Sequence, residues 1–300
     1  MKLPRPWAIL AASLVANTVL FGLPADYPPP LHDAIAGLLL LASVASAGFA
    51  AARALAGEGG GDALRLRAVA AVLLVAPFAL FSLLLGIGPP RVQPASDNDL
   101  RFLLLAIGAM LLGGGLMVLK EALAAAGERA YASVGFAAIA LASPLYVAFA
   151  LIQRIDYVAV ELGYSWAGSV DGTTRELTPL DALSIAALYF GCALTYIATA
   201  SFAQALSRVG WLGRGAATAL QVVSALGLAF LIARGFAYPS PHAAFSHWYT
   251  IPGFIAGIPA VPWIPVCVTG VLLLRRGDRE RAAVVALNAP ARRAVPATPT

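Results

Sequence analysis

The sequence predicts an all-α polytopic membrane protein, built as a bundle of eight transmembrane helices with both termini in the cytoplasm. Three observations predict this fold class. Hydrophobic residues make up 60% of the 300-residue chain and charged residues only 12%, whereas about 25% of the residues in a soluble domain are charged. Eight apolar runs are each long enough to cross a hydrocarbon core about 30 Å thick. The basic residues cluster between alternate runs, as is typical of membrane proteins.

The eight predicted spans follow one another along the chain. The first begins behind the basic segment MKLPRP and resembles a signal peptide, but its exit, LFGLPADYPPP, lacks a small-x-small cleavage site. We therefore interpret it as a helix. Capping residues precede two later spans, with Ser96 and Asp99 before the fourth and Thr178 and Asp181 before the sixth. The spans are expected at residues 7–23, 31–56, 63–88, 100–120, 130–153, 180–206, 215–236 and 251–274.

The distribution of charge orients the predicted bundle. If the N-terminus lies in the cytoplasm, most of the 20 lysines and arginines fall on the cytoplasmic side. The positive-inside rule favours this orientation, with both termini cytoplasmic and the chain in the inner membrane of a bacterial-type cell. The net charge of +5 then reflects membrane orientation, and no nucleic-acid partner is needed to explain it. The basic residues left outside are Arg91, Arg101, Arg154, Arg175 and Arg234.

The predicted organisation is one transmembrane domain followed by a short tail. Residues 1–281 hold all eight predicted spans. Residues 282–300, which begin AAVVALNAP, show little helical periodicity and are expected to form a disordered cytoplasmic tail. The two cysteines, Cys192 and Cys267, lie inside apolar runs and are interpreted as small core residues rather than metal ligands or a disulfide.

The last predicted span contains an unusual run of prolines, IPGFIAGIPAVPWIPVC, at residues 251–267. A helix over residues 263–276 alone would be about 21 Å long, too short to cross the membrane. The proline-rich half is therefore predicted to be part of the crossing, as one helix kinked by Pro259, Pro262 and Pro265.

The prolines would leave the carbonyls of Ile255, Ile258 and Val261 without their usual helical donors. Two interpretations remain open. The carbonyls line a cavity, as in transporters with interrupted helices, or neighbouring helices satisfy them and the kink serves packing. On the first interpretation, Pro259 and Pro262 mark a ligand-binding segment.

Polar residues at membrane depth form a second group of candidates. No predicted span has a carboxylate, lysine or histidine near its middle, which disfavours a proton-coupled carrier, a retinal protein and a bis-histidine haem protein. Neutral side chains remain. Asn17, Tyr196 and Gln221 are interpreted either as interhelical hydrogen-bonding residues or as ligand-binding residues.

Three arginines lie against the charge trend at the outer membrane edge: Arg101, Arg154 and Arg234. Guanidinium groups at one level can hold an anion such as a phosphate or a lipid head group bidentately. The alternative is that they pair with nearby aspartates and act only as interfacial anchors.

Two outer-side histidines, His242 and His247, lie in the segment SPHAAFSHWYTIPG. With a loop carboxylate such as Asp156 or Glu161, they would supply the ligands of a metal site. The neighbouring aromatic residues favour an interfacial belt instead.

Three functional hypotheses follow from these residues. The chain is an integral inner-membrane protein that binds or passes a small anionic or lipid-like ligand through an outward-facing vestibule. Alternatively, it is a non-catalytic accessory or scaffold subunit, or a membrane enzyme with a shallow outer-side metal site. No catalytic residue and no cofactor are predicted, and the expected partners are the lipid bilayer and an unidentified small-molecule or lipid ligand.

Overall fold

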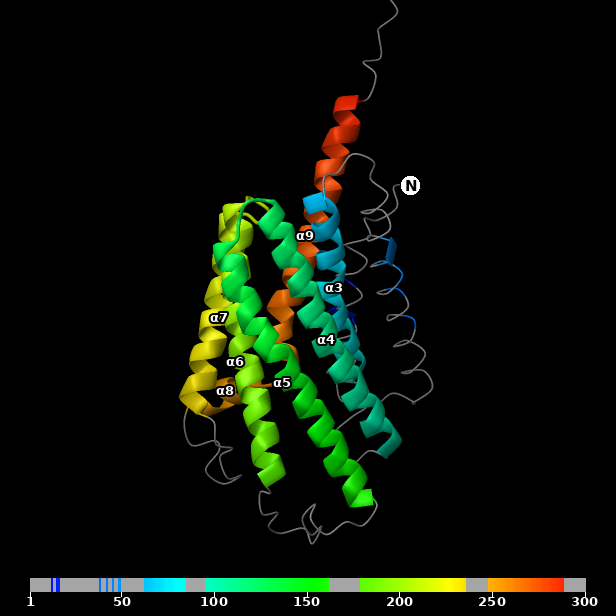
Figure 1. Ribbon diagram of the computed structural model, residues 1–300, viewed down its shortest axis with the longest axis vertical. Coiled ribbons are helices and arrows are strands. Elements are labelled where there is room, and N and C mark those ends of the chain that lie inside the picture. Colours follow the sequence, from blue (N-terminus) through cyan, green and yellow to red (C-terminus); the bar gives the residue numbers. More distant parts are fainter. Residues whose placement is uncertain are drawn as a thin grey trace, which may run out of the picture.

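The computed structural model describes residues 62–84, 95–161, 179–235 and 248–288, together with isolated positions between residues 12 and 49. These four ranges are helical apart from short turns (Figure 1). Their helices are α3 (Asp62–Leu84), α4 (Ala95–Ala125), α5 (Ala130–Glu161), α6 (Pro179–Arg208), α7 (Arg214–Arg234), α8 (Thr250–Ala256) and α9 (Ala260–Asn288).

Six of these helices, α3 to α7 and α9, contain a stretch that is long and apolar enough to cross a membrane. The chain is therefore a multi-pass integral membrane protein, as the sequence predicts. The spans predicted at residues 7–23 and 31–56 lie outside the described ranges, as do both termini. The total of eight helices and the side of each terminus accordingly stay predictions.

Each helix from α3 to α7 packs against the next one in the chain, and α9 packs against α3, α6 and α7. Figure 1 shows that the start of α3, the α4–α5 turn, the α6–α7 turn and the final part of α9 lie at one end of the bundle. We call this the basic end, because it carries a set of basic side chains. They are Arg65, Arg67, Lys120, Arg129, Arg208, Arg214, Arg275, Arg276 and Arg279.

An ionic cluster joins three parts of the chain at the basic end. The carboxylate of Glu280 on α9 accepts hydrogen bonds from Arg67 on α3 and from Arg276 one turn earlier, the latter at 2.6 Å. Arg67 also lies over the ring of Trp211 in the α6–α7 turn, with its guanidinium carbon 5.1 Å from the ring centroid. Arg276 donates to the carbonyl of Gly210 in that turn. Hydrogen bonds between charged groups are the stronger kind, so this cluster ties α3, α9 and the turn together.

The middle of the bundle is organised around Trp263 of α9, whose residue surface is only 1% exposed. Its ring meets Tyr146 of α5 edge to face at a centroid distance of 5.4 Å, and Phe81 of α3 at 6.2 Å. Gly108 of α4 makes room for it, because a Cβ at that position would lie 3.0 Å from the indole ring. Trp263 therefore joins α9 to three other helices, α3, α4 and α5, through contacts of a large buried ring.

The prediction of a single kinked helix over residues 251–274 is wrong. The structure has a short helix, α8, a break at Gly257–Pro259, and a separate long helix, α9. The length argument failed because it ended the helix at residue 276. Instead, α9 continues through the basic residues to Asn288, so it crosses the membrane without α8 and extends past the predicted domain boundary at residue 281.

Local turns satisfy two of the carbonyls that the prolines were expected to expose. The carbonyl of Ile255 accepts the N–H of Ile258 at 3.0 Å, and the carbonyl of Ile258 accepts the N–H of Val261 at 2.9 Å. These are tight i to i+3 bonds, which commonly form at helix ends. Pro262 lies in the first turn of α9, where a missing N–H costs no helical hydrogen bond.

Candidate ligand-binding site

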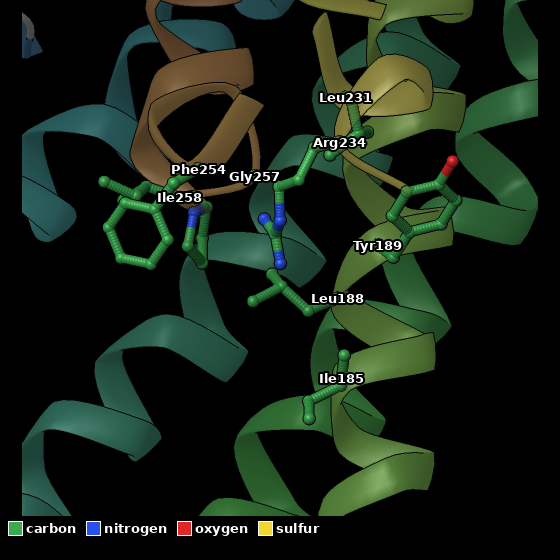
Figure 2. Close-up of a pocket in the computed structure, with 9 residues that line it drawn as sticks. Ile185, Leu188, Tyr189, Leu231, Arg234, Phe254, Gly257 and Ile258 are labelled. Carbon is green, nitrogen blue, oxygen red and sulfur yellow. The ribbon is translucent and has the colours of Figure 1, made fainter. Parts of the chain in front are cut away.

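A small cavity lies beside the break between α8 and α9, at the end of the bundle opposite the basic end (Figures 1 and 2). It encloses about 140 Å³ between α6, the last turns of α7, α8 and the connection to α9. Its lining residues are Ile185, Leu188, Tyr189, Leu231, Arg234, Phe254, Gly257, Ile258 and Pro259.

Two glycines bring α8 into close contact with α7. A Cβ added at Gly253 would lie 2.5 Å from the Cβ of Arg234 and 2.6 Å from the carbonyl oxygen of Phe230. A Cβ at Gly257 would lie 2.7 Å from Nη1 of Arg234. At Gly253 no larger residue fits without moving a helix, because the close atoms belong to the backbone and a Cβ, so the close approach requires glycine there. At Gly257 a larger residue would displace the guanidinium of Arg234.

Arg234 is the last residue of α7, and its side chain enters the cavity. Gly235 ends the helix with a φ of 80°, and its N–H bonds to the carbonyls of Leu231 and Ile232.

The Nη1 atom of Arg234 donates to the carbonyl of Gly253 at 3.4 Å, and the guanidinium carbon lies 5.8 Å from the ring centroid of Phe254. Figure 2 shows the guanidinium between α8 and Tyr189 of α6, pointing toward Leu188. A guanidinium at a helix C-terminus is electrostatically favoured there.

Side chains from α6 complete the hydrogen bonding of the break. The hydroxyl of Tyr196 donates to the carbonyl of Ala256 at 3.1 Å, and the thiol of Cys192 donates to the carbonyl of Gly257 at 3.5 Å. Tyr196 also lies directly against α7, where a Cβ at Gly227 would be 2.5 Å from its ring. An interrupted helix is tolerated within a membrane protein when neighbouring groups satisfy its backbone in this way.

The chemistry of the cavity is simple. Among the nine described lining residues, Arg234 has the one charged side chain, and none of the nine is acidic. Tyr189 has the one neutral polar side chain. The walls otherwise consist of aliphatic and aromatic side chains, a glycine and a proline. A guanidinium in such surroundings attracts an anion more strongly than it would in water, because the local dielectric constant is low.

The three outer arginines that the sequence singles out occupy different environments. Only Arg234 lines the cavity. Arg154 on α5 makes a two-point ion pair with Asp99 on α4, at 2.7 and 3.2 Å, which matches the pairing alternative for that residue. Arg101 is buried on α4. The structure thus does not gather these residues into one arginine rim around the cavity.

The remaining sequence candidates are also distributed. Pro259 lines the cavity, whereas Pro262 is buried in the first turn of α9. Gln221 bonds to Gln204 of α6 at 2.8 Å. Since Gln221 is 13 residues before Arg234, it lies about 20 Å away along α7.

Three sequence candidates lie outside the described ranges: Asn17, His242 and His247. The metal-site hypothesis, which depends on the two histidines, therefore stays a hypothesis.

Sequence reasoning did not identify Tyr189, Leu188 or Phe254. The residues from α6 share one face, because 185, 188 and 189 follow the i, i+3, i+4 pattern of a helix. The useful signal was the small-xxx-small spacing of Gly253 and Gly257, which is typical of close helix packing in membranes.

Comparison of the chain with protein-family models, with curated proteins and with solved structures finds no match.

Proposed function

We propose that this membrane protein binds or passes a small anionic or lipid-like ligand at the cavity beside the α8–α9 break. The observation that carries the proposal is the position of Arg234, whose guanidinium enters a cavity with mostly apolar walls, where none of the nine described lining residues is acidic. Arginine suits such a site because its planar group recognises carboxylates and phosphates through two parallel hydrogen bonds.

The distribution of charge supports an orientation for this site. The basic end carries most of the cationic side chains of the described helices, and such ends face the cytoplasm in inner-membrane proteins. On this basis, the cavity opens toward the outer side of a bacterial-type inner membrane, and the ligand approaches from that side.

The scaffold hypothesis is the second candidate, and two contacts favour it. Tyr196 and Gln221, the described polar residues considered as ligand-binding groups, each bond to another part of the chain. A protein whose polar groups serve packing alone would show such contacts throughout. The scaffold hypothesis predicts that Arg234 also acts only in packing, so the two candidates differ in whether an anion binds there.

Thermal unfolding of the protein in a neutral detergent distinguishes these candidates. The probes are inorganic phosphate and octanoate, because arginine recognises phosphates and carboxylates. Three proteins are compared: wild type, Arg234→Gln and Arg154→Gln. A ligand that binds only the folded state at 100 times its dissociation constant adds about 2.7 kcal/mol to the free energy of unfolding. We expect one or both probes to raise the melting temperature of wild type and of Arg154→Gln, but not of Arg234→Gln.

Arg154→Gln is the matched control, since Arg154 lies at the same end of the bundle but pairs with Asp99. Equal stabilisation of all three proteins would mean that the anions act elsewhere. No stabilisation of wild type by either probe would favour the scaffold hypothesis.

A further inference from the structure

We infer that the ligand of this cavity is an amphiphilic monoanion, a molecule with one negatively charged head and an apolar chain, and that it reaches Arg234 from the lipid bilayer. This inference rests on the proposed function and names its ligand class. Four features of the cavity support it: its charge, its position along α6, the surface around its opening and its size.

The charge of the cavity suits a single negative charge. Among the described residues that line the cavity, Arg234 is the one cation. A multiply charged phosphate ester would bring further negative charge into a mostly apolar space, which is costly without further cations. A carboxylate or a phosphodiester carries one charge, and one guanidinium can neutralise it.

The position of the cavity along α6 corresponds to the depth of a lipid head group when that helix is centred in the bilayer. With 30 residues, α6 is about 45 Å long, which exceeds the hydrocarbon core by about 15 Å. Ile185 lies six residues, or about 9 Å, from the start of that helix. If α6 is centred in the bilayer, Ile185 is near the boundary between the hydrocarbon core and the head groups. Arg234 ends α7 at the same cavity, so its charge is placed where lipid charges are found.

The opening of the cavity is apolar. Ile185, Leu188 and Ile258 are only partly buried, and Phe254 is 46% exposed. On α8, Ile251 and Ile255 beside Phe254 are exposed as well. In a membrane-spanning chain these exposed side chains face lipid tails. A wholly water-soluble anion would gain nothing from this surface, whereas the chain of an amphiphile would bury apolar area against it.

The size of the cavity indicates which part of the ligand it holds. Pockets that hold drug-sized ligands measure about 300–1,000 Å³, so a space of about 140 Å³ accommodates a compact head but not a whole lipid. The chain must then leave through the apolar opening and lie along α6 and α8.

Native mass spectrometry of the protein in a neutral detergent tests this inference. The probes are phosphatidylglycerol, phosphatidylcholine with the same acyl chains, and glycerophosphoglycerol, which is the soluble head group of the first lipid. We expect phosphatidylglycerol to bind about tenfold or more tightly than phosphatidylcholine, a difference of about 1.4 kcal/mol or more. Both lipids carry a phosphodiester, but the choline cation of phosphatidylcholine cancels the negative charge that Arg234 would neutralise. Equimolar glycerophosphoglycerol should not displace it.

Two variants and one control locate the lipid. Arg234→Gln should weaken phosphatidylglycerol binding about tenfold or more, while Arg154→Gln should leave it unchanged. Because Arg234 also contacts α8, a second variant, Leu188→Trp, fills the cavity and keeps the charge. It should weaken binding as well, and the melting temperature of each variant shows that it is folded.

The outcomes separate this inference from the proposed function. Equally tight, Arg234-dependent binding of glycerophosphoglycerol and phosphatidylglycerol would overturn the lipid inference and leave the anion site standing. If no probe binds in an Arg234-dependent way, both proposals are overturned.

Discussion

Gly253 of α8 lies so close to Arg234 of α7 that a Cβ on the glycine would be 2.5 Å from the Cβ of the arginine. The same contact places the Gly253 carbonyl 3.4 Å from Nη1 of Arg234. Because the arginine both packs against α8 and enters the cavity, the position of this short helix sets the shape of the candidate site. The stability of the helix break and the binding properties of the cavity are thus physically linked.

Gly253→Ala should displace α8. In an ordinary helix, replacing glycine by alanine is favourable by about 1 kcal/mol, but here the added methyl group meets backbone and Cβ atoms that cannot rotate away. We expect a net loss of up to about 2 kcal/mol in the free energy of unfolding, since overpacking costs about 1–3 kcal/mol and the gain in helix propensity offsets about 1 kcal/mol of it. Gly215→Ala is the matched control, because a Cβ at Gly215 meets no atom within 4 Å. Unfolding in mixed micelles measures both, and equal stabilisation by the two substitutions would contradict the close contact.

Tyr196→Phe should destabilise the helix break. The substitution removes the donor to the Ala256 carbonyl, at 3.1 Å, and leaves that carbonyl unsatisfied in a buried position. A cost of about 1–3 kcal/mol in the free energy of unfolding is expected for such a group. Tyr131→Phe provides the comparison, because Tyr131 is exposed. If both variants unfold like wild type, the Tyr196 hydroxyl does not hold the break.

Glu280→Gln should weaken the basic end. Glu280 accepts hydrogen bonds from Arg67, which is buried, and from Arg276. Removing the negative charge leaves two arginines facing each other without their shared anion, and hydrogen bonds to charged groups are worth about 1.5–3 kcal/mol. Glu121→Gln breaks only an exposed pair with Lys120, for which about 0–1 kcal/mol is expected. The prediction fails if the two substitutions lower the free energy of unfolding by the same amount.

Trp263→Phe should destabilise the bundle without affecting the candidate site directly. The smaller ring leaves space among α3, α4 and α5, where Trp263 is almost completely buried. Large-to-small core substitutions cost about 0.5–5 kcal/mol, depending on the size of the cavity that is left. Trp248→Phe, at a residue that is 80% exposed, should change stability little. Thermal unfolding compares them, and a smaller effect at Trp263 than at Trp248 would contradict its central position.

The sequence was sufficient to predict most of the described spans, because a membrane span is determined by length and apolar composition. The span predicted at 215–236 corresponds to α7 at Arg214–Arg234. The end of α9 was missed for a physical reason. A helix can continue through a basic segment when its charges find partners, and here Glu280 bonds to Arg276 one turn away and to Arg67 on α3.

The candidate site was predictable only in part. Arg234 was found because its charge opposes the positive-inside trend, and Pro259 because proline interrupts helices. Tyr189 and Leu188 could not be found in this way, since ordinary membrane helices contain many such residues. Their role depends on how α6 packs beside α8, and that packing is determined by tertiary contacts such as Tyr196 against Gly227.

The most direct test of the central claim is native mass spectrometry of the protein as it is extracted from the membrane, without any added probe. Wild type, Arg234→Gln and Arg154→Gln are purified in parallel in a neutral detergent. We predict that wild type and Arg154→Gln carry extra mass above the 30.9 kDa of the chain. This extra mass should survive gentle activation, be lost on unfolding and belong to an anionic molecule. Arg234→Gln should lack it. A bare wild-type chain, or the same bound molecule in all three proteins, would contradict the claim that Arg234 holds an anion at the helix break.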